Sequence, residues 1–475
     1  MTVRWLRWRT LAALLLGAWA LWTLEAARGG VEIDEMRVGP TPVTIWGAEN
    51  TGPAVVMAHG FAGSRQMMQG YGLVLAQAGY RVYAFDFLGH GRHPQPMSGD
   101  VTAVDGTTRL LVNQTLEVID AARANDGDIA LVGHSMATDV LVRAAREVEG
   151  IGPLVLLATF SGAITAEAPD DVLMITGAWE PRLQGFAADA VAEAEAGVRR
   201  EAMIAPAVEH VAILHSRAGR KATLDWLNTY YGRHAEVPVP QTGWALIGML
   251  AAITMLFAPV AQLFPARDVP MRALSWRRFA GVVCAPMLVT PVVAAPVETQ
   301  VLPVLVADYL ALHLLIYGVI QLAVLWVTSA RPGAFSVTGG VLVLIWTVGL
   351  FGFALDRYGA NFWPVPERWG IIAALALGAV PFMLADAWSV HGAGPARRVV
   401  ARIGFLVSLA IAVAMDFEGL FFLLLIAPVI VLFFLSFGWI GRVAARRFGA
   451  IGPGVGLGLA LAWALGVSFP LFSAG

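Results

Sequence analysis

The order of apolar and polar positions divides this chain into two unlike halves. Between about residue 31 and residue 232, short apolar runs alternate with stretches whose apolar residues recur at helical spacing. The runs that predict strands are AVVMAHG, YRVYAFDF, IALVGHS, PLVLLAT and DVLMITG. Strand–helix alternation is typical of parallel strands joined by crossover helices, so we expect an α/β sheet in this half.

From about residue 241 the pattern changes to long apolar segments. Eight of them have lengths that suit membrane helices, near residues 241–263, 279–297, 301–328, 334–355, 369–389, 399–415, 419–440 and 451–472. In the last segment we interpret Gly454 and Gly458 as small residues that allow close helix packing. The two prolines of GRHAEVPVPQ indicate a linker over residues 233–240.

The N-terminal residues have the pattern of an export signal. Arg4, Arg7 and Arg9 precede an apolar run that begins at Leu11, and the apolar character lasts to about Ala27. A cleaved signal peptide and an uncleaved anchor share this pattern. We favour the anchor because no convincing small-residue cleavage site follows. The predicted domains are therefore an anchor (1–30), a sheet domain (31–232), the linker (233–240) and a membrane domain of about eight helices (241–475).

The charged residues of the second half predict its orientation. Arginines gather in alternate loops, and the loops between them hold mostly acidic residues, with Arg357 and Arg368 as exceptions. The basic loops contain Arg267, Arg272, Arg277, Arg278, Arg331, Arg397, Arg398, Arg442, Arg446 and Arg447. The other loops contain Glu298, Asp356, Glu367, Asp416 and Glu418. Because basic loops remain cytoplasmic, the sheet domain is expected outside the cytoplasm and the N-terminus inside it.

Composition agrees with a protein that is largely embedded in a bilayer. The chain is 57% hydrophobic and 14% charged, which excludes a protein that is soluble throughout. Its net charge of −2 implies no general affinity for nucleic acid. The single cysteine, Cys284, excludes an intrachain disulfide and a zinc site built from cysteines, and we expect no metal or other cofactor.

One motif in the first half carries candidate chemistry. Gly133-His134-Ser135-Met136-Ala137 closes a predicted strand and precedes a helical stretch. A serine in such a strand-to-helix turn presents its hydroxyl above the carboxyl edge of the sheet, where it can act as a nucleophile. The alternative interpretation is an ordinary connection between a strand and a helix.

A second glycine-rich turn, His59-Gly60-Phe61-Ala62-Gly63-Ser64, follows the first predicted strand of the domain. Acyl transfer needs two hydrogen-bond donors that are directed at the developing oxyanion. The backbone N–H groups of Phe61 and Met136 are the natural pair. We interpret His59 as a structural histidine that holds this loop.

These motifs resemble the α/β-hydrolase superfamily, in particular its lipase, esterase and serine-aminopeptidase-like branch. His59-Gly60-Phe61, the loop Asp86-Phe87-Leu88-Gly89-His90-Gly91 and the Ser135 motif occur in the family's order over about residues 40–232. Ala137 departs from the pattern, because the family usually has glycine there. The resemblance implies a mostly parallel sheet with helices on both faces and a triad in the order nucleophile, acid, histidine. It also implies that the Asp86–Gly91 loop is structural.

The resemblance assigns the other two members of the triad by their places after later strands. Glu180 follows DVLMITG, where the family's acid stands, with Asp170, Asp171 and Asp189 as alternatives. His210 stands in a loop before an apolar turn and is favoured as the base over His215. Only Phe160 to Asp170 separate two predicted strands, so no large cap is expected. The site is then open unless the membrane domain covers it.

The function that the resemblance implies is serine hydrolysis through an acyl-enzyme on Ser135. The expected substrate is a small-molecule or lipid-like acyl compound with an ester, thioester or lipid acyl bond. A peptidase or an acyltransferase would use the same triad. A transporter or scaffold with a non-catalytic hydrolase-like domain is a further alternative. Asp308 and His313 lie in one apolar segment, and we interpret them as partners in helix–helix hydrogen bonds rather than as a polar pathway.

Overall fold

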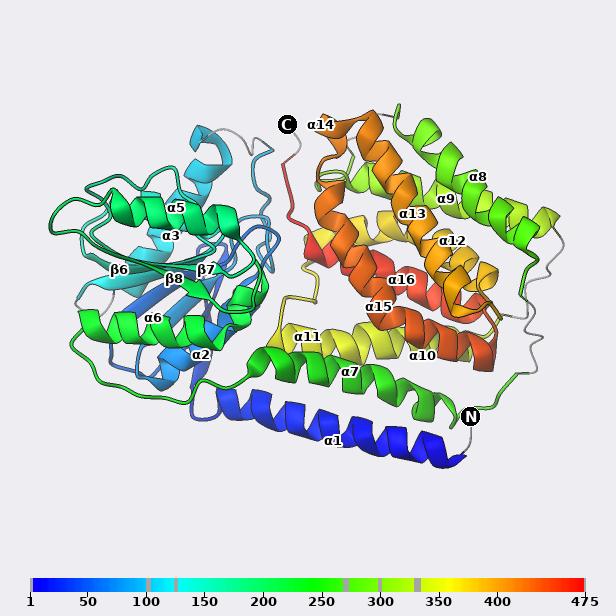
Figure 1. Cartoon of the computed structure of the whole chain (residues 1–475), viewed down its shortest axis with the longest axis horizontal. Helices are drawn as coiled ribbons and strands as arrows, with labels where there is room; N and C mark the ends of the chain where they lie inside the picture. Colours follow the sequence, from blue (N-terminus) through cyan, green and yellow to red (C-terminus); the bar gives the residue numbers. More distant parts are fainter. Residues whose placement is uncertain are drawn as a thin grey trace.

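A computed structural model describes residues 3–99, 104–123, 127–267, 273–297, 301–328 and 335–473. Arg272, Glu298 and Arg331, which contribute to the predicted orientation, lie outside the described residues. A layered sheet domain occupies one end of the molecule, and a bundle of long helices occupies the other (Figure 1).

The sheet domain is built on one eight-stranded sheet with the strand order β1-β2-β4-β3-β5-β6-β7-β8. β1 and β2 run antiparallel, and all pairings from β4 to β8 are parallel. This confirms the α/β sheet. The strands are β1 (Ile33–Val38), β2 (Thr41–Trp46), β3 (Ala54–Ala58), β4 (Arg81–Phe85), β5 (Ile129–His134), β6 (Ile151–Leu157), β7 (Asp171–Gly177) and β8 (Arg199–Ala205).

Three strands lie outside the apolar runs that predicted the other five. β1 (IDEMRV) and β8 (RREAMIA) form the two edges of the sheet, so parts of them face solvent and they carry charged residues. β2 (TPVTIW) includes a proline and two threonines. An apolar run therefore detects the central parallel strands, which are buried on both faces, and misses the two edge strands and β2, whose buried residues include polar threonines.

Helices cover both faces of the sheet, as the resemblance implied. α3 (Arg109–Ala122), α4 (Met136–Ala145) and α5 (Pro181–Ala192) pack on one face, and α2 (Gln69–Gln77) and α6 (Arg217–Tyr230) pack on the other. Neighbouring residues of β3 alternate between the two cores, with Val56 in the first and Val55 in the second. Residues 233–240 form no helix or strand and lead into α7.

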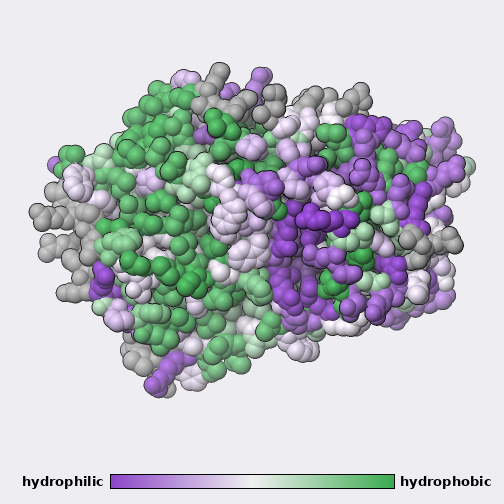
Figure 2. All heavy atoms as spheres, turned by 180° about the vertical axis from the view of Figure 1, so that it is seen from behind, coloured by the Kyte–Doolittle hydropathy of each residue, from purple (hydrophilic) through white to green (hydrophobic). Residues whose placement is uncertain are grey.

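Within the described ranges, nine helical segments are long and apolar enough to cross a membrane. They lie in α1 (Val3–Arg28), α7 (Thr242–Ala261), α8 (Trp276–Ala294), α9 (Ala307–Val327), α10 to α11 (Val337–Tyr358), η5 with α12 (Trp369–Ser389), α13 (Pro395–Met415), α15 (Leu423–Phe448) and α16 (Ile451–Ser468). Hydrophobic residues gather on the surface of this half, and hydrophilic residues gather on the sheet domain (Figure 2). These features indicate a multi-pass membrane protein.

The helix bounds refine the predicted segments. α9 begins at Ala307 rather than near residue 301, and α15 reaches Phe448 rather than residue 440. α16 ends at Ser468, and the last residues of its predicted segment are extended chain. These last residues bond to the sheet domain: the Met97 N–H donates to the Leu471 carbonyl oxygen at 2.8 Å. Sequence hydropathy marks these residues as membrane-like although they are buried between the two halves.

Close approaches of backbone hold the helical half together. A Cβ atom at Gly458 would lie 2.5 Å from Val380 Cα, and one at Gly454 would lie 3.0 Å from Leu384 Cα. Both glycines therefore allow α16 to pack against α12, as expected. His313 is fully buried and lies 3.0 Å from the Tyr309 hydroxyl and 3.1 Å from Ser408 Oγ on α13. The contact with Ser408 joins α9 to α13 and agrees with helix–helix hydrogen bonding for His313. Asp308 instead accepts from the Leu302 N–H at 2.9 Å, in the segment just before its own helix.

Candidate active site

Ser135 stands in a sharp turn between β5 and α4. Its φ of 53° lies in the left-handed region, which residues with a side chain rarely adopt, and its N–H donates to the Leu157 carbonyl oxygen at 2.9 Å. A Cβ at Gly133 would lie 2.6 Å from a Leu141 methyl group and 3.2 Å from the backbone of Ala137, so a side chain there would require its neighbours to move. Ala137 is fully buried and fits the turn at the position where the family usually has glycine. Strain of this kind is typical of a functional position.

Two side chains from later loops meet the Ser135 hydroxyl in a continuous line. His210 Nε2 lies 2.7 Å from Ser135 Oγ, and His210 Nδ1 lies 2.6 Å from Glu180 Oε1. Glu180 is held in turn, because its Oε2 accepts a hydrogen bond from the Gly177 N–H at 2.7 Å. A carboxylate only accepts hydrogen bonds, so Nδ1 carries a proton and Nε2 is free to accept the serine proton.

The alternative residues lie elsewhere. Asp171 begins β7, at the strand end opposite Glu180, and pairs with Arg199 at 3.1 Å. Asp189 is exposed on α5, and Asp170 precedes β7. His215 ends the short helix after His210 and packs under the start of α7, where burial and Arg220 lower its pKa to about 4. The fold therefore brings Glu180 and His210 to the serine, and not these four.

His134 holds the loop of His210 in place, a role that no local sequence pattern indicates. Its Nε2 lies 2.7 Å from the His210 carbonyl oxygen, which can only accept, so Nε2 carries the proton. Burial lowers the pKa of His134 to about 3, and the ring stays neutral near pH 7. His134 directly precedes Ser135 in the chain. The end of β5 therefore both presents the Ser135 hydroxyl and supports His210.

The His59–Gly60–Phe61 turn closes over the serine. A Cβ at Gly60 would lie 2.8 Å from His134 Nδ1 and 3.0 Å from Ser135 Cβ, so only glycine permits this approach. Met136 is the first residue of α4, and its N–H has no carbonyl one turn earlier in that helix. Phe61 and Met136 line one cavity with Ser135. Their N–H groups remain the predicted donors to an oxyanion.

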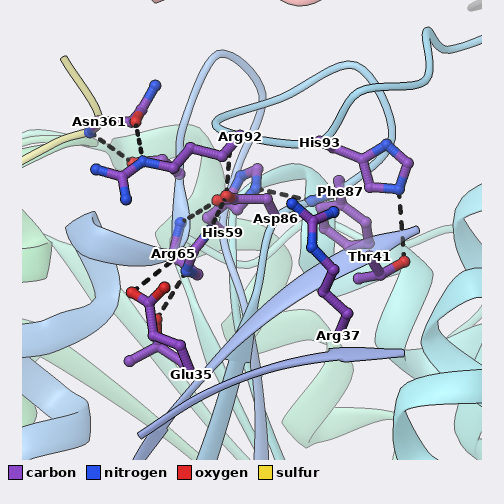
Figure 3. A network of polar contacts seen from close by, with 12 residues as sticks. Glu35, Arg37, Thr41, His59, Arg65, Asp86, Phe87, Arg92, His93 and Asn361 are labelled. Carbon is purple, nitrogen blue, oxygen red and sulfur yellow. Dashed lines mark hydrogen bonds and ion pairs between the residues drawn. The ribbon is translucent and has the colours of Figure 1, made fainter. Parts of the chain in front are cut away.

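A buried polar network supports this turn from behind (Figure 3). His59 Nε2 accepts from the Phe87 N–H at 3.1 Å, so its Nδ1–H donates to the Gly60 carbonyl oxygen at 2.7 Å. Asp86 accepts from the backbone N–H groups of Arg65 and Arg92 and pairs with the Arg65 guanidinium. Burial opposes the charge on Asp86, but Arg65, His59 and the two N–H groups outweigh it and hold the pKa of Asp86 below its usual value. His59 and the Asp86 loop are thus structural, as interpreted.

The same network reaches the helical half. The Arg92 guanidinium donates to Asp356 at 2.6 Å and to Asn361 at 3.0 Å, and the Asn361 N–H donates to Ser64 Oγ at 3.0 Å. Ser64 closes the turn that begins at His59. Residues more than 260 positions away in the sequence therefore hold one side of the candidate site, and no local pattern could reveal them.

The site opens into a cavity of about 630 Å³ with mostly apolar walls. Leu111, Val140 and Leu183 contribute from helices of the sheet domain, and Phe422 and Leu425 contribute from the start of α15. The ring of Phe422 lies 5.9 Å from that of Phe61. Since only residues 158–170 connect β6 to β7, no large cap lies between these strands, and the helical half contributes part of the cavity wall through Phe422 and Leu425.

Comparison with known proteins identifies the fold. Residues 53–249 match a family model described as the alpha/beta hydrolase fold. These residues have the alpha/beta hydrolase fold. The match begins just before β3 and ends within α7, so the antiparallel strands β1 and β2 precede it, and most of the helical half follows it.

Solved structures similar to the hydrolase domain include several kinds of hydrolase. Dienelactone hydrolase from Anabaena variabilis is 18% identical, with a TM-score of 0.34 over 42% of this chain and 97% of its own. A serine hydrolase involved in carbazole degradation is also 18% identical, with a TM-score of 0.34 over 42% of this chain and 100% of its own. An epoxide hydrolase from Vigna radiata is 16% identical, with a TM-score of 0.31 over 42% of this chain and 97% of its own.

Proposed function

We propose that this protein is a membrane-bound serine hydrolase that cleaves ester, thioester or lipid acyl bonds with Ser135, His210 and Glu180 as its triad. The observation that carries the proposal is the unbroken line of contacts from Glu180 through His210 to Ser135, at 2.6 and 2.7 Å. A hydroxyl alone is a weak nucleophile, and this arrangement supplies both a base and a group that orients the base.

In the proposed reaction, Ser135 Oγ attacks the carbonyl carbon of the substrate while His210 Nε2 takes the hydroxyl proton. Glu180 stabilises the imidazolium that forms. The oxyanion of the tetrahedral intermediate accepts hydrogen bonds from the Phe61 and Met136 N–H groups. His210 then gives its proton to the leaving group, and the acyl group stays on Ser135. His210 then takes a proton from water, which attacks the acyl carbon. The bond from that carbon to Ser135 Oγ breaks, His210 returns the proton to Oγ, and the acid is released.

The walls of the cavity favour an acyl chain as the group that is bound. Leu425 lines the cavity, is 46% exposed and lies on α15, a candidate membrane span, so the cavity wall includes a residue of that span. A lipid-like substrate in the bilayer could reach Ser135 along this surface without crossing water. We therefore propose that acyl chains enter between the hydrolase domain and the start of α15.

The proposed orientation places the hydrolase domain outside the cytoplasm. Arg28, at the end of α1, donates to Gln69 of the hydrolase domain at 3.1 Å, so the arginine-rich start of α1 lies at the far end of the bundle. Arg368, an exception to the charge pattern, donates to the carbonyl oxygens of Gly466 and Gly89 and is held by protein rather than by a cytoplasmic surface.

Labelling with a fluorophosphonate tests the triad and the orientation. The wild-type chain should be labelled, Ser135→Ala should not, and Ser436→Ala should be labelled normally because the Ser436 hydroxyl donates to carbonyl groups of its own helix. A membrane-impermeant probe should label intact cells. Unlabelled wild-type protein would favour the non-catalytic alternative, and labelling that survives Ser135→Ala would remove this serine from the mechanism.

Long-chain and short-chain esters test the proposed route. Leu425→Ser should lower kcat/KM for a p-nitrophenyl palmitate substrate by about tenfold, since about 1.4 kcal/mol of apolar contact is lost, and should leave p-nitrophenyl butyrate nearly unchanged. Leu435→Ser is the matched control, because Leu435 lies on the same helix, is 73% exposed and lines no part of this cavity. Equal effects of the two variants would contradict the route.

A further inference from the structure

A second cavity lies in the helical half, at the end of the bundle that is remote from the hydrolase domain. It has a volume of about 390 Å³ and lies between the end of α12, the start of α13 and the end of α15. Arg368, just before α12, touches the hydrolase domain, whereas Asp386 in the cavity wall lies 18 residues further on. At 1.5 Å per residue, the helix carries Asp386 about 27 Å away, close to the thickness of a bilayer core.

The cavity collects positive charge that the described residues do not balance. Arg398 and Arg402 from α13 and Arg442 and Arg446 from α15 line it, and Asp386 is the one carboxylate among the described residues of its wall. Asp386 is 6% exposed and lies 3.6 Å from Arg402. Across the described part of the chain, the other three arginines form no ion pair.

The groups that line this cavity are held in place, and some lack a partner. Arg402 lies 4.6 Å from the centre of the Phe434 ring, and a Cβ at Gly438 would lie 3.3 Å from one of its guanidinium nitrogens. Arg402 Nε and His391 Nε2 are buried without a hydrogen-bond partner among the described residues. Leaving such groups unpaired and several like charges close together costs free energy, which a bound anion would recover.

We propose that this cavity binds a phosphate group, and that its natural ligand is the headgroup of an anionic phospholipid in the leaflet opposite the hydrolase domain. Guanidinium groups bind phosphate oxygens through paired hydrogen bonds, and four arginines around one cavity match that chemistry. Basic pockets between membrane helices on the cytoplasmic side are a known form of lipid site. Val399 and Ile403, on α13 beside the arginines, are more than half exposed and offer apolar surface to the acyl chains. Inorganic phosphate shares the binding chemistry but lacks those chains.

Thermal unfolding of the full-length protein in detergent tests the proposal. The probes are dioleoylphosphatidylglycerol, dioleoylphosphatidylcholine and inorganic phosphate, each titrated separately. Phosphatidylglycerol should raise Tm with saturation, and phosphatidylcholine should raise it far less. Phosphate at the same concentrations should have little effect if the lipid is the ligand, whereas an equal effect of phosphate would identify a site for the free anion.

Two double variants separate a site from general surface charge. Arg398→Gln with Arg442→Gln should weaken the apparent affinity for phosphatidylglycerol at least tenfold. Arg277→Gln with Arg278→Gln removes the same charge from exposed positions at the start of α8, outside the cavity, and should change that affinity by less than twofold. Without lipid, the cavity variant should melt no lower than wild type, because repulsion between arginines is relieved.

Three results would overturn the proposal. The first is equal stabilisation by phosphatidylglycerol and phosphatidylcholine. The second is an equal loss of affinity in the cavity variant and the α8 variant. The third is a cavity variant that melts well below wild type in the absence of lipid, since its arginines would then support the fold rather than a ligand. Each result leaves the proposed hydrolase activity unaffected, because the two cavities lie at opposite ends of the bundle.

Discussion

Replacement of Glu180 by glutamine changes one atom and reverses the hydrogen-bond pattern of the proposed triad. Glu180 accepts two hydrogen bonds, from the Gly177 N–H at 2.7 Å and from His210 Nδ1 at 2.6 Å. A glutamine has one oxygen and one NH2 group. Its oxygen must face the Gly177 N–H, so its NH2 group faces Nδ1 and requires that nitrogen to accept. The proton of His210 then moves to Nε2.

The expected loss follows from that tautomer. With a proton on Nε2, His210 can only donate to the Ser135 hydroxyl and cannot take its proton. In triads of this kind, the same change of the acid to its amide lowers kcat by about 10⁴. That factor corresponds to about 5.4 kcal/mol of transition-state stabilisation. Because the Glu180 side chain is only 8% exposed, water does not easily replace the lost acceptor.

Hydrolysis of p-nitrophenyl butyrate by the full-length protein in detergent measures this effect, with melting as a check on folding. Asp189→Asn is the matched control, since it makes the same chemical change at an exposed carboxylate on α5 and should keep activity within about twofold of wild type. A Glu180→Gln variant that retains more than a tenth of the wild-type kcat would refute the assigned role of Glu180. Equal losses in both variants would point to a general effect of charge.

Three further predictions concern the surroundings of the site. Gly60→Ala should lower kcat by about 10²–10³, because the new Cβ would lie 2.8 Å from His134 Nδ1 and push an oxyanion donor away; kcat near wild type would argue against that donor. Burial lowers the pKa of His134 to about 3 and of His215 to about 4, so the unfolded chain binds more protons below pH 6.5. The free energy of unfolding in urea should therefore fall by about 2 kcal/mol per histidine between pH 7 and pH 5, and His215→Gln should remove its share; an unchanged pH slope in that variant would contradict this account. A double-mutant cycle with Arg92→Met and Asp356→Asn should give a coupling of about 1 kcal/mol in unfolding, and additive effects would mean that this contact does not join the two halves.

Local patterns predicted the features of this protein that depend on neighbouring residues in the chain. The central strands, the helices between them and the long apolar segments follow from residue periodicity and hydropathy, because burial on both faces of a sheet or contact with lipid selects apolar residues over a whole element. The turn around Ser135 was predictable because its small residues are adjacent in the sequence. The edge strands β1 and β8 were not predicted, because their partly exposed residues form no apolar run.

Contacts between distant segments could be decided only by the tertiary structure. The order of strands in the sheet brings the loops of Glu180 and His210 beside Ser135, and the distances that favour His210 over His215 exist only in the folded chain. Three contacts join residues that lie 76 or more positions apart. His134 supports the loop of His210, Arg92 donates a hydrogen bond to Asp356, and Phe422 lines the cavity of Ser135. A hydrogen bond or a packed wall needs two partners at fixed separation, whereas sequence periodicity reports only whether each residue is buried.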